Sequence, residues 1–97
     1  MRVFPMSEMM GEGVLHAFKT LASATAAAGK DGMVYPVVLV PGENLKKVWL
    51  VCFGDGGCTS GILAACADKA SAEAAASTAE KADSSGYSFY TFELDME

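Results

Sequence analysis

Two short apolar runs separated by a polar segment constrain the fold of this chain more than any other feature. The runs cover residues 34–40 and 48–53, and five of the seven residues in the first run are Val or Leu. Runs rich in β-branched and aromatic residues favour strands, and the Pro-Gly and Asn between them favour a turn. We therefore predict that the two runs form a hairpin. Neither run alternates cleanly between apolar and polar residues, so both faces of these strands need cover.

Ala-rich segments on either side of the two runs are expected to supply that cover. Apolar residues recur at helical spacing from Val14 onward, and the Ala run of residues 26–28 continues the same pattern. We predict a first helix that starts near Glu12 or Val14. It is expected to end at Gly29, because glycine suits a left-handed cap.

The Ala-rich second half allows two predictions. In the first, a third strand over residues 59–67 pairs with the preceding run, and a helix over 72–83 follows with Ser71 as its N-cap. In the second, a single helix runs over residues 62–83, because Ala has the highest helix propensity. We favour the strand followed by the helix, and the assignment of residues 59–70 stays open at this point.

Both ends of the chain are expected to be extended. Residues 2–4 are predicted to form a short edge strand that Pro5 ends, and the aromatic-rich residues 87–96 are predicted to form a final strand. The side chains of a strand alternate between its two faces. The predicted core face of the final strand carries Tyr90, Phe92, Leu94 and Met96.

These elements predict a single α+β domain over residues 1–97. We expect a two-layer sandwich of a mostly antiparallel sheet of three to five strands with two helices, in the order α-β-β-β-α-β. A chain of 97 residues is long enough for one core to support the fold. The first 13 residues contain no continuous apolar region, so we expect no signal peptide and a cytoplasmic protein with reduced thiols.

Acidic residues are concentrated in the second half of the chain. The net charge is −5, and residues 48–97 hold two lysines against eight acidic residues. Direct binding of nucleic acid requires Lys and Arg side chains that neutralise phosphates, and the chain has a single Arg. We therefore expect no direct binding of nucleic acid and no binding to anionic membranes.

Residues suited to catalysis are scarce, because the chain has one His and one Arg. A Cys nucleophile would need His16 as its base, and Cys58 is the thiol expected to be accessible. A zinc site would need His16 and all three cysteines, whose spacing differs from that of zinc knuckles. The simpler role for His16 is a surface residue on the polar side of the first helix. We expect no enzymatic activity, no metal and no cofactor.

A Gly-rich segment over residues 54–61 suggests an anion site as an alternative function. The spacing matches neither the P-loop nor the dinucleotide-binding motif. If a long helix followed the loop, backbone amides at its N-terminus could bind an anion. The residues of this alternative site are Gly56, Gly57, Thr59 and Ser60.

Exposed carboxylates form the leading candidate for a binding surface. Glu73, Glu80 and Asp83 are spaced to lie near one side of the second helix, and Glu93 and Asp95 share one face of the final strand. A negative surface without catalytic residues would suit a basic protein surface, including one that normally receives nucleic acid. Solubility alone is the competing explanation for these charges.

Two resemblances bear on this hypothesis. The order helix–strand–strand–strand–helix is similar to the double-stranded RNA-binding domain, but the second helix starts with Ser71-Ala-Glu-Ala where such domains place basic residues on phosphates. In size, acidity and scarcity of catalytic residues the chain resembles phage-encoded anti-defence proteins, including anti-CRISPR proteins. That resemblance implies a nucleic-acid mimic that inhibits a basic partner.

We therefore carry three hypotheses from the sequence. The leading one is a non-enzymatic protein-binding module, with an inhibitor as one form of it. The second is a small-molecule or anion binder at residues 54–61, and the third is a self-associating subunit such as a homodimer.

Overall fold

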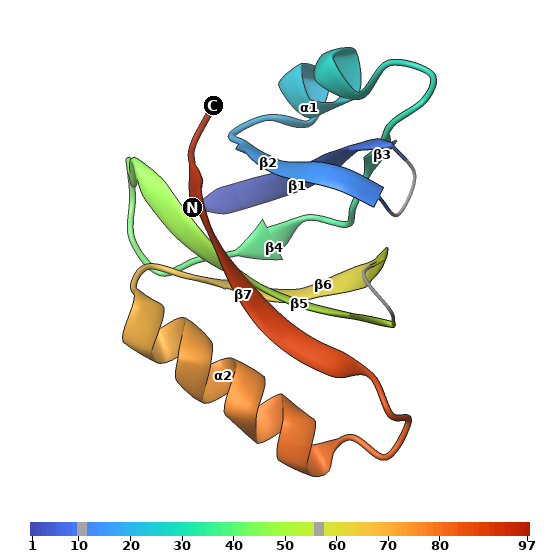
Figure 1. The fold of residues 1–97 in the computed structure, drawn as a ribbon. Helices are drawn as coiled ribbons and strands as arrows, with labels where there is room; N and C mark the ends of the chain where they lie inside the picture. The colour runs from blue at the N-terminus through green and yellow to red at the C-terminus, as the bar shows by residue number, and fades with distance from the viewer. Residues whose placement is uncertain (10–11, 56–57) are drawn as a thin grey trace.

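The computed structural model describes residues 1–9, 12–55 and 58–97, and its elements lie in four layers (Figure 1). From top to bottom these are a helix, a sheet, a second sheet and a second helix. This arrangement confirms the α+β class with antiparallel strands and two helices, and it distributes the strands over two sheets. In chain order the elements are β1 (Arg2–Met9), β2 (Glu12–Phe18), α1 (Leu21–Ala28), β3 (Met33–Val34), β4 (Val38–Leu39), β5 (Lys47–Asp55), β6 (Cys58–Cys66), α2 (Lys69–Ala82) and β7 (Ser88–Asp95).

The first sheet is built around β1, which pairs antiparallel with β2, β3 and β4. The prediction that Pro5 ends a short edge strand was wrong, because β1 continues through Pro5 to Met9. Proline has no N–H group to donate to a neighbouring strand. Pro5 lies opposite the gap between β3 and β4, where the ladder hydrogen bonds do not need an N–H donor from β1. Its carbonyl accepts a hydrogen bond of 2.8 Å from the amide of Tyr35.

The prediction of a helix from Glu12 or Val14 was also wrong, because residues 12–18 form β2. Leu15 and Ala17 are buried in the core between the sheets, and Phe18 is buried on the opposite face under α1. This alternation is the two-residue period of a strand that is covered on both sides. Helix α1 is confirmed only from Leu21, with Thr20 as its N-cap and Gly29, at φ 60°, as the predicted stop.

The second sheet is built around β5, which pairs antiparallel with β6 on one side and β7 on the other. The third strand and the final strand are therefore confirmed. The predicted hairpin between residues 34–40 and 48–53 was wrong, because β3 and β4 pair with β1 in the first sheet. The two runs instead face each other across the core, where Val40 and Leu50 belong to one buried cluster.

Helix α2 begins at Lys69, so a single helix over residues 62–83 is excluded. Its N-cap is Asp68, where Ser71 had been predicted, and the Asp68 carboxylate accepts a 2.8 Å hydrogen bond from the Ser71 amide. The element order also departs from that of the double-stranded RNA-binding domain, because two strands precede α1.

The main core lies between the two sheets. Val3, Val48, Leu50 and Cys52 are fully buried there. Tyr90, Leu94 and Met96 pack against this cluster as predicted, whereas Phe92 on the same face of β7 remains 41% exposed. Within the described ranges, no helix combines the length and apolar character needed to cross a membrane.

Candidate binding cleft between β2 and β7

The two sheets meet along their edges at the ends of β2 and β7. Each of these strands lies at the edge of its own sheet. A parallel bridge joins Ala17 to Met96, and the amide of Glu97 donates a 2.8 Å hydrogen bond to the carbonyl of Ala17. The contact closes one end of the gap between the sheet edges, and the strands diverge from it.

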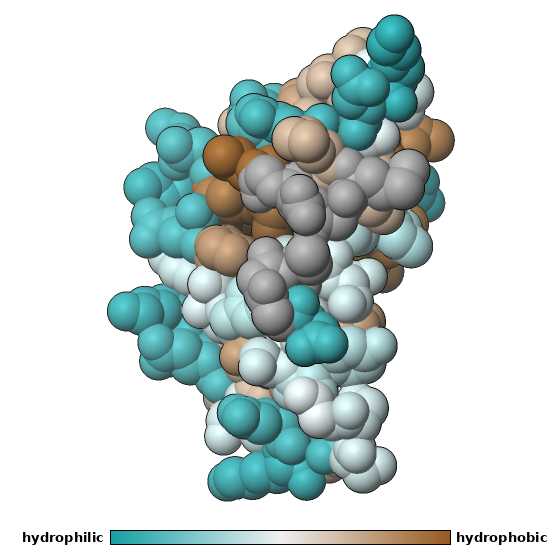
Figure 2. Space-filling model, turned by 45° about the vertical axis from the view of Figure 1, so that its right-hand side comes forward, coloured by the Kyte–Doolittle hydropathy of each residue, from teal (hydrophilic) through white to brown (hydrophobic). Residues whose placement is uncertain are grey.

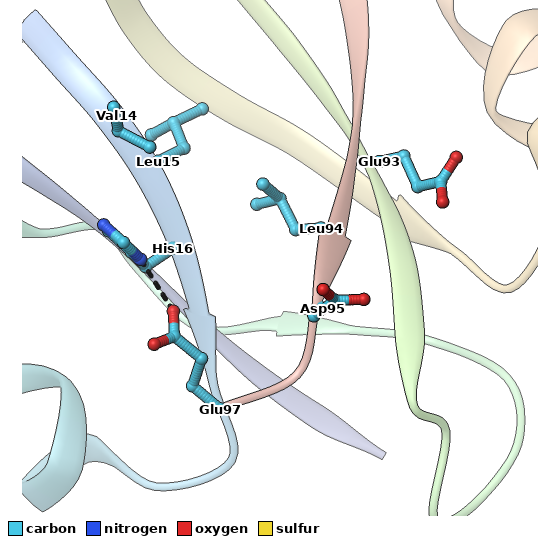
Figure 3. Close-up of a pocket in the computed structure, with 7 residues that line it drawn as sticks. All are labelled: Val14, Leu15, His16, Glu93, Leu94, Asp95 and Glu97. Carbon is cyan, nitrogen blue, oxygen red and sulfur yellow. Dashed lines mark hydrogen bonds and ion pairs between the residues drawn. The ribbon is translucent and has the colours of Figure 1, made fainter.

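An open cleft of about 390 Å³ occupies this gap, and we call it the β2–β7 cleft (Figure 3). Leu15 and Leu94 supply apolar side chains from the two strands, and Val14, 60% exposed, lies at the opening. In Figure 3 the side chain of Leu94 extends toward β2, whereas those of Glu93 and Asp95 extend away from it. The lining residues are Val14, Leu15, His16, Glu93, Leu94, Asp95 and Glu97.

His16 joins the two sides of the cleft through both of its ring nitrogens. Nδ1 lies 2.6 Å from Oε2 of Glu97, and Nε2 lies 2.9 Å from Oε1 of Glu8 on β1. Hydrogen bonding to Glu8 raises the pKa of His16 above its ordinary value of 6.5, Glu97 raises it further, and partial burial opposes the rise. The arrangement favours an imidazolium held between two carboxylates.

These three side chains do not converge on a common point, because the carboxylates lie at opposite nitrogens of the ring. A metal site requires several ligand atoms that are directed at one position. In the part of the chain that the structure describes, no group of three or more His, Cys, Asp or Glu side chains is arranged to hold a metal ion.

Glu93 and Asp95 extend from the other face of β7, and we call them the acidic pair. Lys47 on the adjacent strand contacts both, at 2.9 Å from Oε1 of Glu93 and 3.7 Å from Oδ1 of Asp95. Hydrogen bonding to Glu93 raises the pKa of Lys47. One lysine shared between two carboxylates leaves part of their charge uncompensated.

The predicted acidic residues of α2 lie elsewhere. Glu73 pairs with Lys69 at 3.8 Å, and Glu80 is exposed. Asp83 accepts a 2.7 Å hydrogen bond from the hydroxyl of Ser85, which lowers the pKa of Asp83. Because the short segment after Ala82 leads directly into the start of β7, Glu80 and Asp83 lie near that start. The acidic pair lies toward the opposite end of β7 (Figure 1).

Strand β6, and not a helix, follows the Gly-rich segment, so the predicted anion site lacks the helix N-terminus on which it depended. Gly56 and Gly57 lie outside the described residues, and Thr59 and Ser60 belong to strand β6. The hydroxyl of Thr59 lies 3.0 Å from that of Tyr90, and the Thr59 carbonyl accepts a 3.3 Å hydrogen bond from Tyr35. Thr59 therefore contributes to packing between strands.

The face of the molecule shown in Figure 2 is uneven in polarity. On the face shown, apolar groups gather in the upper half of the view and are bordered by hydrophilic groups, whereas the lower half is hydrophilic or nearly neutral. Val14, which lines the β2–β7 cleft, is an exposed apolar residue, and so is Phe92, which precedes the cleft residue Leu94 by two positions on β7.

Glu93 and Asp95, predicted from the sequence as candidate binding residues, are among the residues that line the cleft, but the cleft itself was not predicted. Leu15 and His16 had been assigned to a helix, which concealed that one side of residues 14–18 faces the final strand. Val14, Leu15 and Phe18 fit a strand covered on both faces as well as a helix, so the local sequence contains no decisive signal for β2. The comparisons add no assignment: no family model matches the chain, and neither a curated protein nor a solved structure matches it.

Proposed function

We propose that the protein is a non-enzymatic binding module that holds a basic segment of a partner protein at the β2–β7 cleft. The observation that carries this proposal is the combination of an open apolar cleft with carboxylates from three parts of the chain. Glu8 and Glu97 lie beside His16, and the acidic pair extends from β7. The net charge of −5 favours encounter with a basic partner.

The state of the potential catalytic groups supports a binding role. Both nitrogens of His16 are engaged by carboxylates, so neither is free to serve as a general base. Burial raises the pKa of Cys52 to about 12, which keeps that thiol protonated and unreactive. A cytoplasmic location, where thiols stay reduced, belongs to the same proposal.

Inhibition is one form that such binding can take. A partner surface that normally receives nucleic acid is rich in Lys and Arg. A protein that occupies this surface with carboxylates competes with the nucleic acid. In this form of the proposal, binding of the protein and binding of nucleic acid to the partner are mutually exclusive.

Quantitative affinity capture with two matched variants tests the proposal. The Glu93→Gln/Asp95→Asn variant, called the cleft variant, removes the two charges of the acidic pair on the strand that borders the cleft, and the Glu73→Gln/Glu80→Gln control removes two charges on α2. We expect wild type and control to retain the same basic proteins from an extract of the native cell at low salt. The cleft variant should lose them, and high salt should release them from the wild type and the control.

The other outcomes of this experiment would contradict the proposal or assign a different binding surface. Undiminished capture by the cleft variant would contradict the proposal. Loss of capture in the α2 variant alone would move the binding surface to Glu73 and Glu80. Equal loss in both variants would reduce the interaction to nonspecific attraction by net charge.

A further inference from the structure

The outer edge of β7 has a regular pattern of backbone groups. The amide of Met96 donates to the carbonyl of Lys46 at 2.8 Å, on the β5 side, and the amide of Glu97 donates to Ala17 on the opposite side. The pairing with β5 runs without a register shift from Asp95 to Ser88. Successive residues of a strand direct their backbone groups to alternate sides, so the even-numbered residues of β7 face β5 and the odd-numbered residues face outward.

This edge is available over most of its length. Among the described strands, β7 has β5 as its ladder partner, and the contact with Ala17 reaches only the end of β7 at Met96. The outward backbone groups of Phe89, Thr91 and Glu93 therefore form an unpaired edge. Such an edge readily accepts an extended segment from another chain.

We propose that the partner's basic segment adds to the outer edge of β7 as a fourth strand of the second sheet. This inference rests on the proposed function and specifies how the partner is held. The contact at Ala17 limits the added strand to the part of β7 before Asp95.

The two faces of β7 define the side chains that the segment must carry. Side chains of an added strand alternate between faces and lie beside those of its neighbour. On the inner face they would contact Phe92 and Leu94 and enter the apolar β2–β7 cleft. On the outer face they would lie beside Thr91 and the acidic pair. The segment is therefore an extended peptide in which apolar and basic residues alternate.

Charge complementarity favours this occupant over a second copy of the chain. Another β7 would bring its own Glu93 and Asp95 to the edge, and each copy carries a net charge of −5. Lys47 compensates only part of the charge of the acidic pair. A lysine or arginine on the added strand completes that compensation.

A library of random nine-residue peptides displayed on phage, selected against the immobilised wild-type protein, provides the probe. We expect the enriched peptides to alternate apolar residues with Lys or Arg. Their affinity should then be compared for wild type, Thr91→Pro and Thr91→Ala. Proline at position 91 removes an outward N–H without removing a bond to β5, whereas alanine keeps that N–H.

Thr91→Pro should weaken binding about tenfold or more, since position 91 can no longer donate a hydrogen bond to the added strand and the proline ring blocks close approach. Thr91→Ala should change affinity by less than about threefold. Enriched peptides that are N-methylated at alternate residues provide a second test that does not depend on the folding of a variant. Methylation of the peptide residues whose N–H groups face β7 should abolish binding, whereas methylation of the intervening residues should be tolerated.

The inference would be overturned by enrichment of no peptide, by equal binding to Thr91→Pro, or by equal tolerance of both methylation patterns. If capture of basic proteins still required Glu93 and Asp95, the proposed function would stand while strand addition failed. If capture of basic proteins did not require Glu93 and Asp95, both the proposed function and strand addition would be contradicted. A wild-type dimer that Thr91→Pro converts to a monomer would assign the edge to a second copy and also overturn the inference.

Discussion

His16 and Glu97 tie the edges of the two sheets together, with Nδ1 of the imidazole 2.6 Å from Oε2 of the carboxylate. The same ring contacts Glu8 through Nε2 at 2.9 Å. The contact lies directly beside the parallel bridge between Ala17 and Met96. One ionisable side chain therefore helps to set how far the β2–β7 cleft opens.

The His16 contacts should make stability depend on pH. Folding raises the pKa of His16 above 6.5, so its stabilising effect is fully present below that value and is lost as the pH rises through the folded pKa. At about pH 6, His16→Gln should lower the free energy of unfolding by about 0.5–1 kcal/mol, as expected for a partly exposed ion pair. Urea denaturation at about pH 6 and pH 9 measures the difference, which should shrink at the higher pH. A difference that grew with pH would contradict the assignment of an imidazolium.

Packing between the sheets should dominate the stability of the fold. Leu50 is fully buried in the main cluster, whereas Leu63 on the neighbouring strand β6 is 47% exposed. Leu50→Ala should cost about 2–5 kcal/mol, because it removes buried apolar area and leaves a cavity. Leu63→Ala should cost less than about 1 kcal/mol. Equal costs in thermal or urea unfolding would mean that the core lies elsewhere.

The start of α2 offers a direct comparison of two candidate caps. The Asp68 carboxylate accepts hydrogen bonds from the amide and the hydroxyl of Ser71, at 2.8 and 3.1 Å. Asp68→Ala should therefore cost about 1 kcal/mol of stability, because it leaves an amide of the first turn without its partner. Ser71→Ala keeps the amide and should cost less. The reverse order in urea unfolding would restore Ser71 as the cap that the sequence suggested.

The buried thiol of Cys52 should be protected from modification. Desolvation raises its pKa to about 12, so the thiolate is scarce at neutral pH and the sulfur is enclosed. In a Cys58→Ser/Cys66→Ser variant, iodoacetamide should label Cys52 slowly when the protein is folded and rapidly in denaturant. Mass spectrometry measures both rates, and similar rates would contradict the burial of this residue.

Local patterns predicted strands and helices better than they predicted partners. Residues 34–40 and 48–53 contain strands as expected, but the partner of β3 and β4 is β1, which is distant in sequence. Turn chemistry between two runs favours a hairpin, yet it cannot reveal that β1 offers the first run a competing edge. Pro36, which has no N–H to donate, lies between β3 and β4 and splits the first run into two short strands.

The error at residues 12–18 has a similar origin. Val14, Leu15 and Phe18 fit helical spacing, and the same residues also fit a strand covered on both faces. Pairing with β1 decides between these structures, and that contact lies outside any local window.

The candidate site was predicted in part for the same reason. The acidic pair could be placed on one face of the final strand from alternation alone. The contact between His16 and Glu97 spans 81 residues of sequence and follows only from the packing of two sheet edges. The cleft therefore could not be predicted while β2 was taken for a helix.

Amide hydrogen exchange of the protein with and without an enriched basic peptide tests the central claim most directly. Outward amides of a free edge exchange quickly, whereas amides that bond to β5 are already protected. The account predicts that the peptide slows exchange at Thr91 and Glu93 and leaves α2 unchanged. Slower exchange confined to α2, or no change along β7 with peptide bound, would contradict binding at the β2–β7 cleft.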